Sequence, residues 1–235
     1  MAIVKHIKSK NANYTDAINY LFYQHDEKTK TLLLNEYGQP MLREEFYEDG
    51  LNCTPETFDL DCSGTNRTFN KNRRPGEIKS HHYIISYDPR DASDCGLTGE
   101  KAQELSLEVA QKMFPGHQAL VVTHTDGENH SGNIHTHIVI NSVRANETEK
   151  EDYMTQASDY KAGGKHRSTN KFMEHFKKEV MAMCEREGLH QIDLLSPAPE
   201  KVTEAEFRAK SRGQEKMEKI NKKITAEGLK PSATT

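Results

Sequence analysis

The most constraining feature of this sequence is a pair of histidine-bearing segments that flank a turn-rich connector. The first segment ends in His124-Thr-Asp126, and the second runs Asn133-Ile-His-Thr-His-Ile-Val-Ile-Asn141. Both segments are rich in β-branched residues, which favour strands, and Asp, Gly, Asn and Ser between them favour a turn. We therefore expect a β-hairpin that brings the histidines of the two strands together.

The spacing within the second segment sets the direction of its side chains. Successive strand residues point to opposite faces, so His135 and His137 share one face, roughly 7 Å apart along the strand. Ile134, Thr136, Ile138 and Ile140 take the other face, which we expect to be the core face. With His124 from the neighbouring strand, the two imidazoles make a three-nitrogen metal site with open coordination positions, as a catalytic metal requires.

The alternative for any one strand histidine is a hydrogen-bonded polar residue, but the two motifs together favour a metal. Asp126, two residues beyond His124, is expected to accept a hydrogen bond from an imidazole and fix its tautomer. His130, in the connector, is expected to be exposed and not a ligand. Imidazole ligands suit Zn²⁺, Mn²⁺, Ni²⁺ or Co²⁺, so ligand type alone does not predict magnesium.

Composition predicts one domain, or one domain with an appendage. The chain has 235 residues, of which 34% are hydrophobic, and it has neither an apolar run of about 20 residues nor the apolar core of a signal peptide. We expect a cytoplasmic protein without membrane contact. The four cysteines, Cys53, Cys62, Cys95 and Cys184, form no C-x-x-C pair, so reduced bystanders are expected, and a metal at Cys53 and Cys62 is the weaker alternative.

Periodicity and turn signals give the expected order of elements. An apolar stripe at helical spacing predicts a helix from Asn13 or Thr15 to about Gln24, and Thr203-x-x-Glu206 is a capping box for a peripheral last helix. A hairpin of residues 31–34 and 40–42 is also expected. The remaining predictions are strands at 2–7, 81–87, 118–124 and 133–144, and helices at 98–113 and from Ser168 or Asn170 to 187.

This order predicts an α+β fold. Its centre would be a mostly antiparallel sheet of about five strands, covered by helices, with hairpin-linked central strands carrying the histidines. Residues 1–198 would form the domain, with an irregular polar insertion at residues 26–76. Residues 199–235 would be a peripheral helical extension, and its frayed sequence could be an arbitrary cut in a longer protein.

The charge balance argues against a nucleic-acid binder, but the distribution of charge does not. The net charge is −4, yet residues 66–74 and 161–171 each hold four positive charges and no acid. A solvated surface is the usual meaning of such runs, but with interleaved amides and hydroxyls they also suit phosphate contact, and Phe69 could stack on a single-stranded base. The candidate DNA contacts are Arg67, Phe69, Lys71, Arg73, Arg74, Lys165, Arg167 and Lys171.

One tyrosine of the first helix is not needed for packing. The apolar stripe there is Tyr14, Ala17, Ile18, Leu21 and Phe22. At about 100° per residue, Tyr20 lies nearly opposite this stripe. Tyr23 also lies off the stripe, on the same side of the helix as Tyr20.

At this point the sequence resembles a known family. His124-Thr-Asp126 with Asn133-Ile-His-Thr-His-Ile-Val-Ile-Asn141 resembles the histidine motif of HUH relaxases, with a connector a few residues longer than in many members. Tyr20 in Ile-Asn-Tyr-Leu, the strand His82–Tyr87 and the segment Phe172–Leu189 resemble the MobP-type branch (MobA/MobL, VirD-like). The resemblance covers about residues 1–195 and is weakest over 26–76.

The resemblance implies a DNA-nicking enzyme of conjugative or mobilizable elements. In this family a tyrosine attacks a phosphodiester at the origin of transfer, leaving a 5′-phosphotyrosine and a free 3′-OH. The nucleophile would be Tyr20, with Tyr23 as runner-up and Tyr14 third; His124, His135 and His137 would hold the metal. Mn²⁺ or Mg²⁺ is expected, with Zn²⁺, Ni²⁺ or Co²⁺ as alternatives.

The implied partners are single-stranded or hairpin origin DNA, accessory relaxosome proteins and a type IV coupling protein. A monomer is expected in the bacterial cytoplasm, carried to the recipient on the DNA.

Three other functions fit part of the pattern. A replication initiator or single-tyrosine transposase of the HUH class could share the histidines, but those proteins usually place the tyrosine after them. A metal-dependent DNA- or partner-binding module would form no covalent adduct. A three-histidine zinc hydrolase would cut without an adduct, and this sequence offers it no evident general base other than Asp126.

Overall fold

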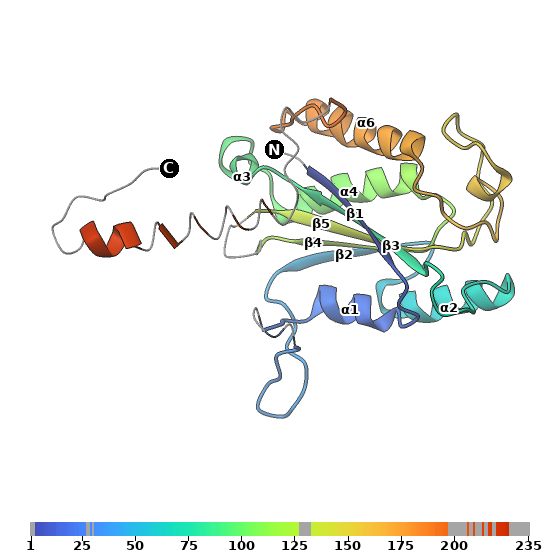
Figure 1. Ribbon diagram of the computed structural model, residues 1–235, viewed down its shortest axis with the longest axis horizontal. Helices are drawn as coiled ribbons and strands as arrows, with labels where there is room; N and C mark the ends of the chain where they lie inside the picture. Colours follow the sequence, from blue (N-terminus) through green and yellow to red (C-terminus); the bar gives the residue numbers. More distant parts are fainter. Residues whose placement is uncertain are drawn as a thin grey trace. The chain divides into compact units, whose positions relative to one another are not determined.

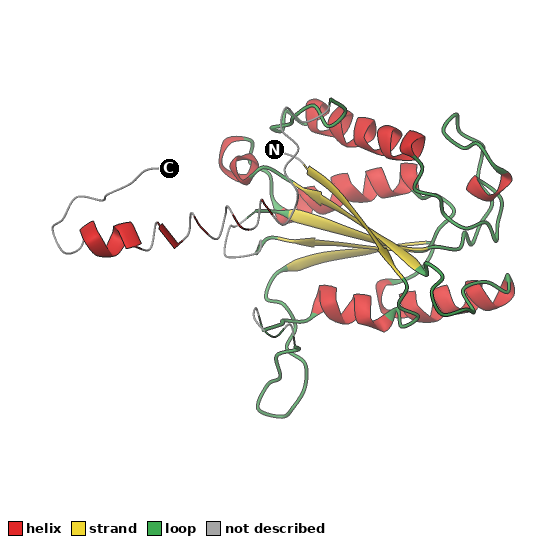
Figure 2. Cartoon of the chain, in the orientation of Figure 1, coloured by secondary structure: helices red, strands yellow, loops and turns green. Residues whose placement is uncertain are grey.

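The two histidine strands lie within one five-stranded sheet. Strands β4 (Ala119–His124) and β5 (His135–Asn141) pair antiparallel, with His124 opposite His135. With β1 (Ile3–Ser9), β2 (Phe46–Leu51) and β3 (Ser80–Ser86), the strand order is β1-β3-β5-β4-β2. All four ladders are antiparallel, so the predicted α+β class, with hairpin-linked strands at its centre, is confirmed (Figure 2).

The coordinates are a computed structural model that describes residues 3–26, 29, 31–126, 133–196, 206, 209, 213, 216, 217 and 220–225. The chain divides into two compact units, Met1–Leu195 and Ser196–Thr235. Within the second unit, residues 220–225 are helical. The connector around His130 (residues 127–132) and the predicted cap Thr203 lie outside the described residues. No helix among the described residues is long and apolar enough to span a membrane.

Helices cover both faces of the sheet (Figure 1). Helices α1 (Thr15–Phe22) and α2 (Phe58–Thr68) lie on one face, and α4 (Gly99–Met113) and α6 (Asn170–Arg186) lie on the other. The hydroxyls of Thr98 and Thr169 accept hydrogen bonds from the first-turn amides of α4 and α6, as N-caps do. The short elements are η1 (Pro55–Thr57), α3 (Pro89–Asp94) and η2 (Ala157–Asp159).

Both faces of the sheet are packed, so the expectation of a single core face was incomplete. Ile138 and Ile140 pack with α4 and α6 as expected. Val139, on the histidine face, packs with Leu21, Phe22 and Phe58 in a second cluster. The histidine face is therefore apolar at its centre, with the three histidines at the His124/His135 end and a buried hydrogen-bonded group around Asn141 at the other end.

Residues 26–76, expected to be an irregular insertion, contain part of the domain itself. Strand β2 completes the sheet by pairing with β4 along Phe46–Leu51, and α2 buries Phe58 and Cys62. These elements carry few apolar residues because β2 is an edge strand and α2 contacts the sheet through one narrow side. The predicted hairpin of residues 31–34 and 40–42 is present, with Leu34 paired to Pro40.

Candidate active site

Three imidazoles converge at one end of the sheet. His124 ends β4, and His135 and His137 begin β5; one ring nitrogen of each lies within 4.8 Å of the other two. The ring centroids are 4.9–5.3 Å apart. This is the arrangement that the spacing of the two motifs predicts.

Backbone carbonyls fix the tautomers of two of these rings. His124 Nε2 lies 2.8 Å from the carbonyl oxygen of Leu21, and His135 Nδ1 lies 3.1 Å from that of Asn133. A carbonyl oxygen only accepts, so each of these nitrogens carries the proton. The lone pairs are then on His124 Nδ1 and His135 Nε2, the nitrogens that a metal would use.

A fourth histidine supports the third ring. His82, on β3, places Nε2 2.7 Å from His137 Nδ1. If His137 binds a metal through Nε2, its Nδ1–H must donate to His82, as in the outer hydrogen bonds that orient metal-bound imidazoles. His82 was not among the predicted site residues, although the strand sequence His81-His82-Tyr83 carries a signal. Because strand side chains alternate, one of two consecutive histidines must face the histidine side of the sheet.

Burial keeps the imidazoles of His82, His124 and His137 neutral. It lowers the pKa of His124 to about 3, with a smaller contribution from the positive charge of Arg43, and it lowers the pKa of His82 to about 4. The pKa of His137 is also well below its usual value because the ring is buried. Neutral rings with lone pairs directed at a common point are metal ligands, so the residues present fit a divalent cation.

Asp126 does not take the role that its position suggested. Its carboxylate pairs with the Arg43 guanidinium at 2.7 Å, while backbone carbonyls fix the imidazole tautomers. The reason is geometric: Asp126 lies beyond the end of β4, where its side chain is exposed, whereas α1 brings the Leu21 carbonyl directly against His124. Arg43 follows the hairpin of residues 31–42, and no sequence motif pointed to it.

The three tyrosines of α1 and its ends have different surroundings. Tyr14 is buried, its hydroxyl donates toward the Lys79 carbonyl oxygen at 2.9 Å, and burial raises its pKa to about 12. Tyr23 packs against the apolar cluster beneath α1. Tyr20 is 45% exposed, and its ring meets that of His137 edge-on at 5.9 Å between centroids. Of the three, Tyr20 is therefore the one whose ring contacts one of the three converging histidines.

A cleft lies beside Tyr20. Its volume is about 250 Å³, and it lies between α1 and strands β1 and β3, with His82 on its wall. Its polar lining includes Asn11 and Asn13 from the loop that leads into α1, and Asp16 from the first turn of α1. The cleft is therefore lined both by Tyr20 and by His82, the histidine that hydrogen-bonds to His137.

Comparison with known proteins identifies the family. The sequence model of the MobA/VirD2-like relaxase family, nuclease domain, matches residues 33–189. The chain belongs to this relaxase family. The match begins beyond Tyr20, so it includes the metal-site histidines but not the tyrosine.

Relatives of this relaxase domain occur in Staphylococcus aureus. A protein named rlx is 32% identical over 142 residues, which are 60% of this chain and 36% of that protein. A second rlx protein is 27% identical over 160 residues, 68% of this chain and 39% of that protein. The chain thus spans less than two fifths of the length of these relatives. Among solved structures, the MobM relaxase domain bound to 26-nucleotide pMV158 oriT DNA is 15% identical, with a TM-score of 0.45, over 88% of this chain and 98% of that one.

The two basic segments of the relaxase domain, residues 66–74 and 161–171, lie side by side. They are distant from His124, His135 and His137. Phe69 lies against the backbone of Gly163, and Lys165 faces Glu77 at 3.7 Å. They adjoin the Ser80/Asn141 end of β3 and β5, whereas the metal-site histidines are at the opposite, Ser86/His135 end. At about 3.3 Å per residue, these ends are roughly 20 Å apart.

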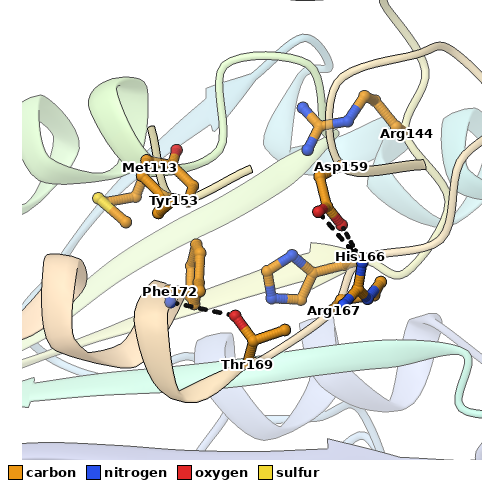
Figure 3. Close-up of a pocket in the computed structure, with 8 residues that line it drawn as sticks. All are labelled: Met113, Arg144, Tyr153, Asp159, His166, Arg167, Thr169 and Phe172. Atoms are coloured by element: carbon orange, nitrogen blue, oxygen red, sulfur yellow. Dashed lines mark hydrogen bonds and ion pairs between the residues drawn. The ribbon is translucent and has the colours of Figure 1, made fainter. Parts of the chain in front are cut away.

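The predicted DNA contacts divide by their surroundings. Arg67, Lys71, Arg73, Arg74 and Lys171 have exposed side chains. Lys165, Arg167 and Phe69 are half-buried, and Arg167 pairs with Asp159 at 3.2 Å (Figure 3). The contact of Phe69 with Gly163 occupies part of the ring that was expected to stack on a base.

Figure 3 shows a small pocket at the start of α6, next to the second basic segment. It includes Arg144, Tyr153 and Asp159, and its volume of about 10 Å³ is enough for one water molecule. Nε and Nη1 of Arg144 are buried without a hydrogen-bond partner among the described residues. The pocket is too small for a nucleotide, so the cleft beside Tyr20 is the candidate substrate site.

Proposed function

We propose that this domain nicks one strand of origin-of-transfer DNA by tyrosine transesterification. The observation that carries the proposal is the convergence of His124, His135 and His137 beside Tyr20, whose ring contacts His137. Membership of the relaxase family supports the same reaction. Initiation of conjugative transfer or mobilization is the corresponding biological role.

The nucleophile is Tyr20. Its phenolic oxygen forms a bond to the scissile phosphorus, the bond from phosphorus to the 3′ oxygen breaks, and the products are a 5′-phosphotyrosine and a 3′-OH. The link conserves the energy of the phosphodiester, so the strand can be rejoined by reversal. Tyr23 is the runner-up, but its packing against the apolar cluster disfavours it.

His124, His135 and His137 hold the divalent cation. When bound, the cation offsets negative charge on the phosphate and helps to orient it for in-line attack. The carbonyl of Leu21, the residue after Tyr20, orients His124, so one turn of α1 positions both the nucleophile and a ligand. We propose Mn²⁺ or Mg²⁺ as the physiological cation.

A phenol has a pKa near ~10 and needs help to lose its proton at neutral pH. His25 is the proposed acceptor. Its ring lies 5.9 Å from that of Tyr20, and its Nδ1 donates to the Tyr23 carbonyl oxygen at 2.9 Å. The lone pair is therefore on Nε2, which can take the phenolic proton. Arg43 supplies positive charge close to His124 and can contact the phosphate.

The DNA runs from the cleft to the basic segments. Arg67, Lys71, Arg73, Arg74 and Lys171 contact phosphates, with Lys165, Arg167 and Phe69 lining the same region. The separation of roughly 20 Å corresponds to about six base pairs of duplex rise, which suits a hairpin stem held away from the cleavage site. Each phosphate contact should contribute about one unit to the salt dependence of binding.

The biological setting is also a proposal. The domain acts as a monomer in the bacterial cytoplasm, with accessory relaxosome proteins and a type IV coupling protein as partners. The protein would reach the recipient attached to the DNA.

The decisive experiment detects the covalent adduct. The protein is incubated with 5′- and 3′-labelled single-stranded origin DNA and Mn²⁺ or Mg²⁺, then resolved on a denaturing gel. We expect the label downstream of the nick to migrate with the protein, and Tyr20→Phe to abolish this band. Tyr23→Phe is the matched control on the same helix and should keep it.

The alternatives give different results. Cleavage without an adduct would indicate the zinc hydrolase, and binding without cleavage would indicate the DNA-binding module. An adduct that persists in Tyr20→Phe would move the nucleophile elsewhere.

A further inference from the structure

A second group of metal-binding side chains lies outside the proposed active site. Asp91 and Cys95 are four residues apart along α3 and its C-cap, so they share one side of that helix. His190 follows the end of α6 and meets them from the other direction. Of the residues that the structure describes, this group and the three active-site histidines are the two that bring three donor atoms within 4.8 Å.

The three donor atoms are close to the positions of one face of a zinc tetrahedron. Cys95 Sγ lies 3.8 Å from His190 Nδ1 and 3.8 Å from Asp91 Oδ1, and the latter two atoms are 2.8 Å apart. Tetrahedral Zn²⁺ with ordinary bond lengths would hold such donors roughly 3.4–3.6 Å apart. The pair at 2.8 Å is shorter because a hydrogen bond now joins it, and a shift of under about 1 Å would admit the ion.

The charges of the group favour a cation. Asp91 is fully buried, and among the described residues it accepts hydrogen bonds from the His190 ring and from the backbone N–H groups of Asp88 and His190. The side chain of the neighbouring Arg90 donates its hydrogen bonds to Asp88, so its positive charge acts on Asp91 only through space. Asp94 adds a second carboxylate, 3.8 Å from His190 Nε2. A buried carboxylate beside a second acidic group is a place where a divalent ion offsets unfavourable charge.

We propose that Asp91, Cys95 and His190 bind a zinc-class cation that joins the segment after α6 to α3. On binding, the Cys95 thiol loses its proton to solvent, and the His190 proton moves from Nδ1 to Nε2, where Asp94 can accept a hydrogen bond. Water takes the fourth position. Thiolate, imidazole and carboxylate together select Zn²⁺ over Mg²⁺ or Ca²⁺.

Co²⁺ is the probe that separates this site from the active site, because only a thiolate ligand gives the intense sulfur-to-cobalt charge-transfer band. Untagged, reduced protein is titrated with Co²⁺ under anaerobic conditions. We expect two equivalents to bind, with the band present in wild type and lost in Cys95→Ser. His190→Gln should weaken it strongly, and Cys53→Ser, a half-buried cysteine elsewhere, is the matched control that should keep it.

The double variant His135→Ala/His137→Ala tests independence from the proposed function. It should lose one equivalent and keep the charge-transfer band, and Zn²⁺ at a hundredfold excess over Kd should raise its Tm by roughly 5–10 °C. Absence of the band in wild type, or its persistence in Cys95→Ser, would overturn the proposal. Loss of adduct formation alone would overturn the proposed function and leave this site intact.

Discussion

The sheet carries two groups of histidines that differ in where their nitrogens point. The group proposed to bind the cation, the metal-site group, is His124, His135 and His137, with His82 behind them, and a nitrogen of each of the first three lies within 4.8 Å of the other two. The packed group, on the opposite face, is His81, His117 and His166, with His6. Burial lowers the pKa of members of both groups, so a lowered pKa does not by itself distinguish a metal site.

The difference lies in the partners of the rings. In the packed group, His81 Nδ1 pairs with His6 at 3.0 Å, His166 Nε2 with the Tyr83 hydroxyl at 2.7 Å, and His117 Nδ1 with the Asn141 carbonyl oxygen at 2.9 Å. These rings are used for packing and hydrogen bonding. In the metal-site group, one ring nitrogen of each histidine hydrogen-bonds to a carbonyl oxygen or to His82. The other ring nitrogen of each can then point toward the shared centre. Consecutive residues, His81 and His82, belong to opposite groups because strand side chains alternate.

Removal of a metal ligand should have the largest effect. His137→Gln is expected to reduce nicking by about 10³-fold, because loss of the bound cation removes several kcal/mol of transition-state stabilisation. Mn²⁺ affinity, measured by calorimetry, should fall with it. Unfolding by urea without metal should change little, and a loss of stability as large as that of a core variant would place His137 in the packed group.

His81→Ala should have the opposite profile. His81 is only 2% exposed and contacts His6, Tyr83 and His166, so its truncation leaves a cavity and costs about 2–4 kcal/mol of unfolding free energy. Urea unfolding measures this cost. At a temperature where the variant is folded, Mn²⁺ affinity should equal that of wild type. A tenfold loss of metal affinity would show that the two groups are coupled through β3.

The sequence alone predicted one of these two groups of histidines, but not all of its members or neighbours. The motifs at His124 and His135-Thr-His137 predicted the metal-site group because its geometry follows from strand alternation and one hairpin. His82 and Arg43 required tertiary information: His82 meets His137 across the β3–β5 ladder, and Arg43 arrives from a hairpin that no motif fixes. Strand β2 was missed because an edge strand with Glu48, Asp49 and Gly50 lacks the apolar alternation that identifies strands.

The variant His82→Leu tests how far the metal-site group extends. Leucine removes the acceptor for His137 Nδ1–H, and loss of such an outer hydrogen bond typically costs 10–100-fold in metal affinity. His82→Gln places an oxygen near the position of Nε2 and should restore most of the affinity. Competition against a fluorescent chelator gives the affinity for each variant. Equal affinities for the two variants would mean that His82 only fills space.

The smallest effect concerns pH and the packed group. His117 is fully buried, and its pKa lies well below the usual value because burial disfavours the imidazolium. The unfolded chain takes up this proton near pH ~6.5, so below that pH the unfolded state binds more protons and the free energy of unfolding falls as pH falls. The contribution of His117 is fully present above this pH, and about 1 kcal/mol of it should be lost between pH 6.5 and 5.5.

Asparagine can keep the hydrogen bond that His117 Nδ1 donates to the Asn141 carbonyl, but it does not titrate. Urea unfolding of His117→Asn at pH 7.5, 6.5 and 5.5 should therefore show a pH dependence smaller by close to one proton. An unchanged slope would mean that His117 takes up its proton without unfolding. Its ring would then be hydrated or mobile, and the packed group would share with the metal-site group the capacity to bind a cation.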